Sequence, residues 1–84
     1  MKVKIFSKSG CSMCSPAKEL GLLLAEKGLW VEYFDVGTAE GLAEATFYGI
    51  KDIPAVLIED EEKIVGRWER KVPSFEELKD LCGF

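Results

Sequence analysis

Two cysteines, Cys11 and Cys14, are separated by two residues and lie between a short apolar run and a long helical pattern. A Cys-x-x-Cys pair at the start of a helix can close into a small disulfide and open again. The positive end of the helix dipole favours the thiolate of the first cysteine, and the thiolate is the nucleophile of thiol–disulfide exchange. The spacing therefore predicts a redox site.

Two other uses of the pair stay open. Thiolates are soft metal ligands, so the pair could hold zinc or part of an iron–sulfur cluster. The chain has 3 Cys and no His, so Cys82 is the only further ligand of this kind, and a closed site would need two chains. Alternatively, the disulfide is stable and inert, and the domain only binds partners. We expect no metal and no cofactor beyond the redox-active Cys11–Cys14 pair.

Composition narrows the class of protein. The 84 residues predict a single domain over 1–84, and 48% hydrophobic with 31% charged residues indicates a folded chain. A net charge of −4 disfavours nucleic acid and anionic membranes as partners. The longest apolar runs, 22–25 and 55–58, are too short to span a membrane, and the N-terminus does not resemble a signal peptide. We expect a cytoplasmic monomer.

The hydrophobic pattern predicts seven elements in the order β-α-β-α-β-β-α. Strands are expected over 2–7, 29–36, 55–59 and 63–68, and helices from 11 or 12 to about 27, from about 39 to 48, and after Ser74. Thr38 and Ser74 are expected to cap the second and third helices. The order predicts an α/β sandwich, with a four-stranded mixed sheet and three flanking helices.

The inner faces of the helices follow from the 3.6-residue period. The residues expected there are Met13, Ala17, Leu20, Leu23 and Leu24 in the first helix, Leu42, Ala45 and either Ala43 or Phe47 in the second, and Phe75, Leu78, Leu81 and Cys82 in the third. Cys82 is expected to act as a small buried hydrophobe, with a redox or disulfide role as the alternative.

Over nearly its whole length, the chain resembles the thioredoxin superfamily and, within it, the small glutaredoxin-like redoxins. The motifs that carry the resemblance are Cys11-Ser12-Met13-Cys14 after the first strand, Tyr48-Gly49-Ile50 with Ile53-Pro54 before the third, and Gly66 near the end of the fourth. The resemblance implies a thioredoxin-like fold. It also implies a dithiol–disulfide oxidoreductase, a small electron carrier that reduces protein disulfides.

The resemblance assigns roles to four residues. Cys11 resembles the exposed nucleophile, and Cys14 resembles the more buried resolving thiol. Pro54 resembles the cis-proline that packs against the dithiol. The backbone of Ile53 would then pair with an extended substrate segment, a contact that tolerates many sequences.

Five further residues are expected to contact substrate. Lys8, three residues before Cys11, matches a basic residue of glutaredoxins and would stabilise the thiolate. Ser12 and Met13 stand between the cysteines, where Met13 would shape access or pack in the core. Gly66 matches one position of the glutathione-binding element of glutaredoxins. Arg67 is expected either to touch an anionic partner group or to be an ordinary surface cation.

The chain also departs from both branches of the superfamily. Thioredoxins proper have Trp before the first cysteine, where this chain has Gly10, and a buried Asp six residues before it, where this chain has Ile5. Glutaredoxin-like redoxins that serve ribonucleotide reductase share this mixed character, which makes ribonucleotide reductase a candidate substrate. The expected electron donor is a flavoprotein of the thioredoxin-reductase type, with glutathione as the alternative.

Overall fold

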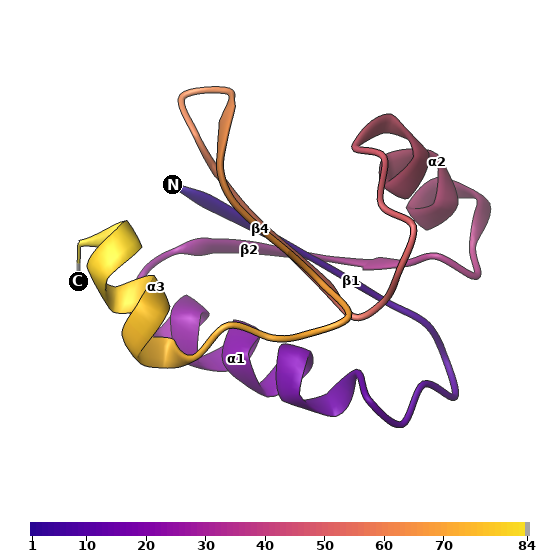
Figure 1. Ribbon diagram of the computed structural model, residues 1–84, viewed down its shortest axis with the longest axis horizontal. Coiled ribbons are helices and arrows are strands. Elements are labelled where there is room, and N and C mark those ends of the chain that lie inside the picture. Colours follow the sequence, from indigo (N-terminus) through magenta and orange to yellow (C-terminus); the bar gives the residue numbers. More distant parts are fainter. Residues whose placement is uncertain (84) are drawn as a thin grey trace.

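The computed structural model describes residues 1–83 and has the predicted order of elements (Figure 1). The strands are β1 (Lys2–Ser7), β2 (Trp30–Asp35), β3 (Ala55–Asp60) and β4 (Lys63–Glu69), and the helices are α1 (Ser15–Glu26), α2 (Ala39–Phe47) and α3 (Phe75–Cys82). The α/β architecture is therefore confirmed. Within residues 1–83, no helix is long and apolar enough to cross a lipid bilayer.

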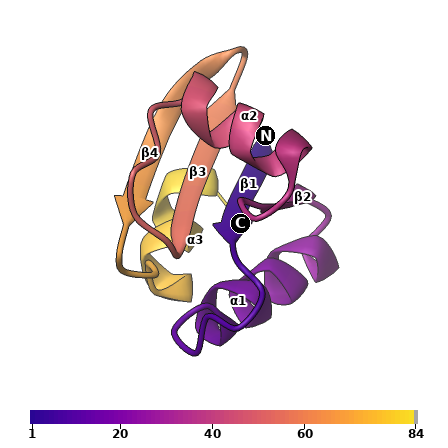
Figure 2. The same cartoon turned by 90° about the vertical axis from the view of Figure 1, so that its right-hand side faces the viewer.

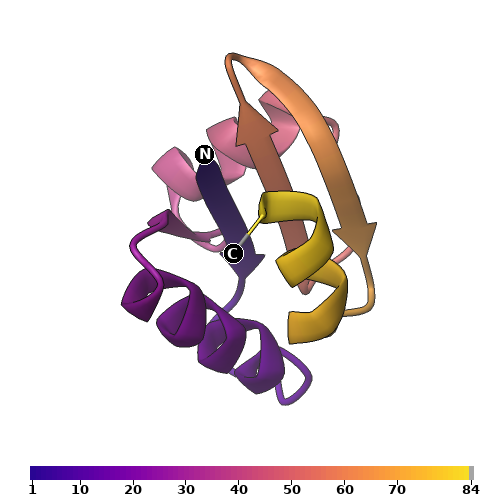
Figure 3. The same ribbon diagram turned by 90° about the vertical axis from the view of Figure 1, so that its left-hand side faces the viewer.

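The strands form one mixed sheet in the order β2-β1-β3-β4. β1 is parallel to β2 and antiparallel to β3, and β3 and β4 form an antiparallel hairpin. α1 and α3 cover one face of this sheet, and α2 covers the other (Figures 2 and 3). The central strands β1 and β3 are buried on both faces, and β3 accordingly has the continuous apolar run 55–58, whereas β1 alternates its first apolar residues with Lys2 and Lys4.

Two apolar clusters fill the space between the sheet and its helices. The larger cluster joins α1 and α3 to the sheet and contains the buried residues Val3, Ile5, Ala17, Leu20, Leu24, Val56, Ile58 and Leu78. The smaller cluster lies under α2 and contains the buried residues Phe6, Ala45, Ala55 and Leu57. α1 and α3 thus share one set of strand residues, and α2 packs on a second set.

The segments that carry the motifs lie together at one end of the strands. Ser7 pairs with Asp35 in the parallel ladder, and Ala55 pairs with both Phe6 and Glu69 in the antiparallel ladders. The ends of β1, β2 and β4 and the start of β3 therefore lie together. We call this side of the molecule the dithiol edge, because residues 8–14 leave it directly after β1.

The first helix begins later than expected. α1 starts at Ser15, with Cys14 as its N-cap and Pro16 in its first turn, whereas residues 11–14 form a turn. The Cys14 N–H donates to the Cys11 carbonyl at 3.3 Å, across three residues instead of the four of an α-helix. The prediction that helical structure begins at residue 11 or 12 is wrong by about one turn.

Met13 and Leu23 were wrongly placed on the inner face of α1, since both are exposed. Ala17, Leu20 and Leu24 are buried as expected, and Gly21 joins them. A Cβ at Gly21 would come 2.5 Å from the Tyr33 hydroxyl, so the absence of a side chain there lets β2 approach the helix.

The prediction for the inner face of α2 is confirmed for Ala45 and wrong for the other expected residues. Gly41 and Ala45 are buried, whereas Leu42, Ala43 and Phe47 are exposed. A Cβ at Gly41 would collide with the backbone of Asp35, so this helix packs its backbone directly against the end of β2. That close approach turns Gly41 toward the sheet, and Leu42, one residue or about 100° further round the helix, points outward.

The predicted helix caps are confirmed. Thr38 Oγ1 accepts from the Gly41 N–H at 3.0 Å, and Ser74 Oγ accepts from the Glu77 N–H at 3.1 Å. In α3, Leu78 is fully buried as expected. Leu81 is 37% exposed and therefore lies at the periphery of the core.

Candidate active site

Cys11 and Cys14 are joined in a disulfide, with their Cα atoms 5.5 Å apart. Cys14 is 1% exposed, whereas Cys11 is only half-buried. An attacking or attacked thiol must be reachable from outside, so the geometry leaves Cys11 as the sulfur that a partner protein can contact. Cys14 is placed to react only with its neighbour.

The turn that carries the cysteines is held by backbone hydrogen bonds. The Cys11 N–H donates to the Lys8 carbonyl at 3.1 Å, and Gly10 between them has φ of 82°, which glycine adopts without strain. The Cys14 carbonyl accepts from Ala17 at 3.1 Å and from Lys18 at 3.2 Å, which begins α1. The positive end of the α1 dipole thus faces the turn. Because α1 begins at Ser15, Cys11 lies about one helical turn further from this end than the sequence predicts.

The Ile53–Pro54 peptide bond is cis, as the resemblance implied. Pro54 is fully buried and Ile53 is half-buried, directly before the first residue of β3. The Pro54 carbonyl accepts from the Arg70 N–H at 2.9 Å. The register therefore brings this segment to the dithiol edge, and pairing of the Ile53 backbone with a substrate stays a prediction.

Lys8, Ser12 and Met13 are all exposed near the disulfide. Met13 is 65% exposed, which removes it from the core and leaves a large apolar side chain on the surface of the turn between the two cysteines. Lys8 Cγ lies 3.9 Å from the position of a Cβ on Gly37, so the lysine stem runs toward the segment after β2. Stabilisation of the Cys11 thiolate by Lys8 stays a prediction.

The structure does not bring Gly66 to the disulfide. Gly66 lies opposite Ile58 in the middle of β4, three residues along β3 from the dithiol edge. A Cβ there would come 2.6 Å from the Trp68 ring and 2.9 Å from Leu81, so Gly66 leaves room for these two side chains to pack over it. The glycine that matches the glutathione-binding element of glutaredoxins is thus explained by packing inside the protein.

Arg67 is neither a free surface cation nor a group aimed at the cysteines. Its Nη1 and Nη2 donate to the carbonyls of Tyr48 and Gly49, both at 2.8 Å. Its Nε donates to Glu69 Oε2 at 3.1 Å. The guanidinium is therefore occupied by its own chain, at the end of α2.

Sequence reasoning missed a buried polar group beneath α2. Lys4 is 6% exposed, because α2 covers the face of β1 to which this side chain belongs. Its Nζ donates to the Tyr48 hydroxyl at 2.7 Å, which in turn donates to Glu59 Oε2 at 3.1 Å. Burial lowers the pKa of Lys4, but the Tyr48 hydrogen bond and the charges of Glu44 and Glu59 outweigh it and raise that pKa.

Cys82 packs half-buried against the larger apolar cluster, as expected of a small hydrophobe. Burial raises the pKa of its thiol, so the thiolate is scarce at neutral pH. Within residues 1–83, no group of three or more His, Cys, Asp or Glu side chains is placed to hold a metal ion.

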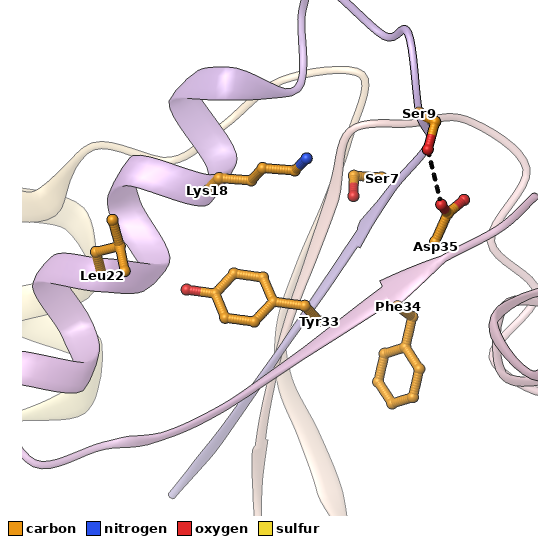
Figure 4. A pocket seen from close by; sticks show the side chains of 7 residues that line it. All are labelled: Ser7, Ser9, Lys18, Leu22, Tyr33, Phe34 and Asp35. Atoms are coloured by element: carbon orange, nitrogen blue, oxygen red, sulfur yellow. Dashed lines mark hydrogen bonds between the residues drawn. The ribbon is translucent and has the colours of Figure 1, made fainter.

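A hollow of about 420 Å³ opens between α1 and the edge strand β2, close to the dithiol edge (Figure 4). The residues that line it are Ser7, Ser9, Lys18, Leu22, Tyr33, Phe34 and Asp35. Ser9 Oγ donates to Asp35 Oδ2 at 3.1 Å across its rim, and the Lys18 side chain extends over it. Neither cysteine lines this hollow, so the reachable sulfur of Cys11 lies outside it.

Known proteins are similar to this chain in sequence. A family model described as a thioredoxin domain matches residues 1–83. A protein of Archaeoglobus fulgidus described as "Probable Thioredoxin" is 35% identical over 80 residues, which cover 94% of this chain and 82% of that protein.

Solved structures show the same fold. Thioredoxin 1 from Thermosipho africanus TCF52B superposes with a TM-score of 0.80 at 23% identity, covering 99% of this chain and 91% of that one. A mutant thioredoxin from Halobacterium salinarum NRC-1 has a TM-score of 0.80 at 25% identity, covering 95% of this chain and 69% of that one. Because the family model spans residues 1–83 and the A. fulgidus relative is covered over most of its length, the chain belongs to the thioredoxin family.

Proposed function

We propose that this protein is a dithiol–disulfide oxidoreductase that reduces protein disulfides and acts as a small electron carrier. The observation that carries this proposal is the Cys11–Cys14 disulfide, with one sulfur reachable and the other buried, on the edge where the Ile53–Pro54 segment is also presented. Membership of the thioredoxin family supports the same reaction.

Two exchange steps account for the chemistry. The Cys11 thiolate attacks one sulfur of a substrate disulfide, which forms a mixed disulfide and releases the other substrate sulfur as a thiolate. That thiolate takes the proton of Cys14, and the Cys14 thiolate then attacks Cys11 Sγ. The mixed disulfide breaks, the second substrate sulfur leaves as a thiolate that takes a proton from solvent, and Cys11–Cys14 is oxidised. Two electrons pass to the substrate, with one proton from Cys14 and one from solvent.

The proton must reach the substrate without help from a buried carboxylate. Ile5, at the position where thioredoxins proper carry a buried Asp, is fully buried in the apolar cluster under α1. The chain has no His to act as a base either. The substrate thiolate released in the first step is thus the base that the reaction itself supplies.

A flavoprotein of the thioredoxin-reductase type is the proposed electron donor. The family match favours this donor over glutathione, and packing of Gly66 together with the internal bonds of Arg67 removes the support for a glutathione element there. Ribonucleotide reductase is a candidate substrate among protein disulfides. On the sequence arguments above, we also propose that the protein is glutaredoxin-like in character, monomeric and cytoplasmic.

Reduction of insulin by the purified protein tests this function. With NADPH and a thioredoxin reductase we expect turnover, whereas with glutathione and its reductase we expect little. Cys11→Ser should abolish turnover with either donor, and Cys82→Ser should leave it unchanged. Unchanged insulin reduction by Cys11→Ser would refute the proposal, and turnover with glutathione alone would reassign the donor.

A further inference from the structure

The end of β4 is tied to the segment that leads into the cis-proline. Arg67 and Glu69 are two residues apart, so their side chains project from the same face of this edge strand. Figure 2 shows the segment between α2 and β3 descending beside β4. We call the two side chains together the Arg67–Glu69 clamp.

Arg67 binds the first part of this segment. Its two terminal nitrogens donate to the Tyr48 and Gly49 carbonyls at 2.8 Å each, at the end of α2. Carbonyls at a helix end have no partner within the helix and carry its negative dipole end, so a guanidinium is well suited to them. The planar fork of Arg reaches both carbonyls at once, which a Lys ammonium could not do with the same geometry.

Glu69 binds the second part. Its Oε1 accepts from the backbone N–H groups of Lys51 at 2.9 Å and Asp52 at 3.3 Å. Its Oε2 accepts from Arg67 Nε at 3.1 Å and lies 3.0 Å from Nη2. The hydrogen bond from the Lys51 N–H lowers the pKa of the Glu69 carboxyl, with the Arg67 and Asp52 contacts acting in the same direction.

The contacts continue on the other side of the proline. The Arg70 N–H, one residue after Glu69, donates to the Pro54 carbonyl at 2.9 Å. Arg67 and Glu69 at the end of β4, and Arg70 directly after it, thus hold backbone groups from Tyr48 to Pro54, and Ile53 lies between the held positions. An isolated surface ion pair contributes little to stability, so the value of this pair is that it places a backbone segment.

We propose that Arg67 and Glu69 are positioning residues for protein substrates: they hold residues 48–52 so that the Ile53 backbone keeps the geometry needed to pair with a substrate strand. This inference rests on the proposed function, because it takes Ile53 as the substrate-pairing residue. Neither side chain touches the cysteines, so the clamp acts on substrate binding and leaves the sulfur chemistry alone.

The test compares a protein disulfide with a small one in the Glu69→Ala protein. Insulin must lie along the backbone before Pro54, whereas the small aromatic disulfide DTNB only needs to reach Cys11. Without the charged acceptor, residues 48–52 should keep the pairing geometry only about a tenth of the time, which would raise the KM for insulin about tenfold. We expect kcat, the DTNB rate and the reduction potential to stay within about twofold of wild type.

Conservative variants sharpen the result. Glu69→Gln keeps an acceptor for the Lys51 and Asp52 N–H groups and should recover most of the insulin KM. Arg67→Lys keeps the charge but loses the fork and should raise that KM. Glu32→Ala, which removes a half-buried acid from the opposite edge strand, is the matched control and should behave as wild type.

Hydrogen exchange reports the clamp directly and does not depend on activity. The Lys51 and Asp52 amides should exchange faster in Glu69→Ala than in Glu32→Ala, and Arg67→Lys serves the same measurement if Glu69→Ala does not fold. An insulin KM unchanged in folded variants, or an equal loss with DTNB, would overturn the inference. A wild-type protein inactive on both disulfides would instead refute the proposed function.

Discussion

At the scale of single residues, the two cysteines differ in access more than in chemistry. Both belong to one short turn, but Cys14 caps α1 and is 1% exposed, while Cys11 stays within reach of solvent. Rates of thiol–disulfide exchange depend on which sulfur can be approached. The division of labour between attack and resolution is therefore a consequence of burial.

Removing the resolving thiol should trap the intermediate. In Cys14→Ser, Cys11 can still attack a substrate disulfide, but no neighbouring thiol can break the mixed disulfide. We expect a covalent complex with insulin chains on non-reducing gels and by mass spectrometry, with turnover reduced by at least about a hundredfold, as for loss of a reacting group. Cys82→Ser is the control, and multiple turnovers by Cys14→Ser without an adduct would contradict the assignment.

At the scale of elements, glycines decide how closely helices approach the sheet. Gly41 has the Asp35 backbone where its side chain would be, whereas Gly21 faces the ends of the Tyr33 and Ile5 side chains. Backbone cannot move aside without shifting a strand, but a side-chain end can rotate. The two helices therefore tolerate added volume to different degrees.

Gly41→Ala should destabilise the fold by about 1–3 kcal/mol, the usual cost of overpacking a tight contact. Gly21→Ala should cost less, because Tyr33 can shift and alanine restores about 1 kcal/mol of helix propensity. Urea denaturation of both variants provides the measurement. Equal stability of Gly41→Ala and the wild type would show that α2 is free to move away from β2.

At the scale of the whole molecule, acid stability should reveal the contribution of the Glu69 carboxylate. Its pKa is lowered in the folded state, so its stabilising effect is complete above the ordinary value of 4.5 and is lost as the pH falls through the folded value. On acidification the unfolded chain takes up this proton at a higher pH than the folded chain does. The free energy of unfolding therefore decreases as the pH falls from 4.5 through the folded pKa of Glu69.

Glu69→Gln mimics the protonated carboxyl and should be less stable than wild type by about 1 kcal/mol at neutral pH, the size of a partly exposed charged hydrogen bond. The difference in unfolding free energy should shrink below pH 4.5 and vanish in stronger acid. Urea titrations at several pH values test this, with Glu32→Gln as the control. A difference that does not change with pH would mean that the charge of Glu69 does not stabilise the fold.

Local patterns determined a large part of this protein. The Cys11–Cys14 spacing, the order of elements and the caps at Thr38 and Ser74 depend on residues close in sequence, so short-range chemistry predicts them. The cis bond at Pro54 was reached through family resemblance, since nothing local distinguishes it.

Tertiary structure alone decided the rest, because long-range contacts set which face is buried and which charge is bound. Lys4 looks like a solvent-facing strand residue until α2 covers it, and Gly41 directs its helix only because the end of β2 comes so near. Arg67 and Glu69 read as ordinary surface charges, yet they hold a segment 17 to 19 residues earlier in the chain. A pairing across that separation leaves no periodic signal, so only the folded chain reveals it.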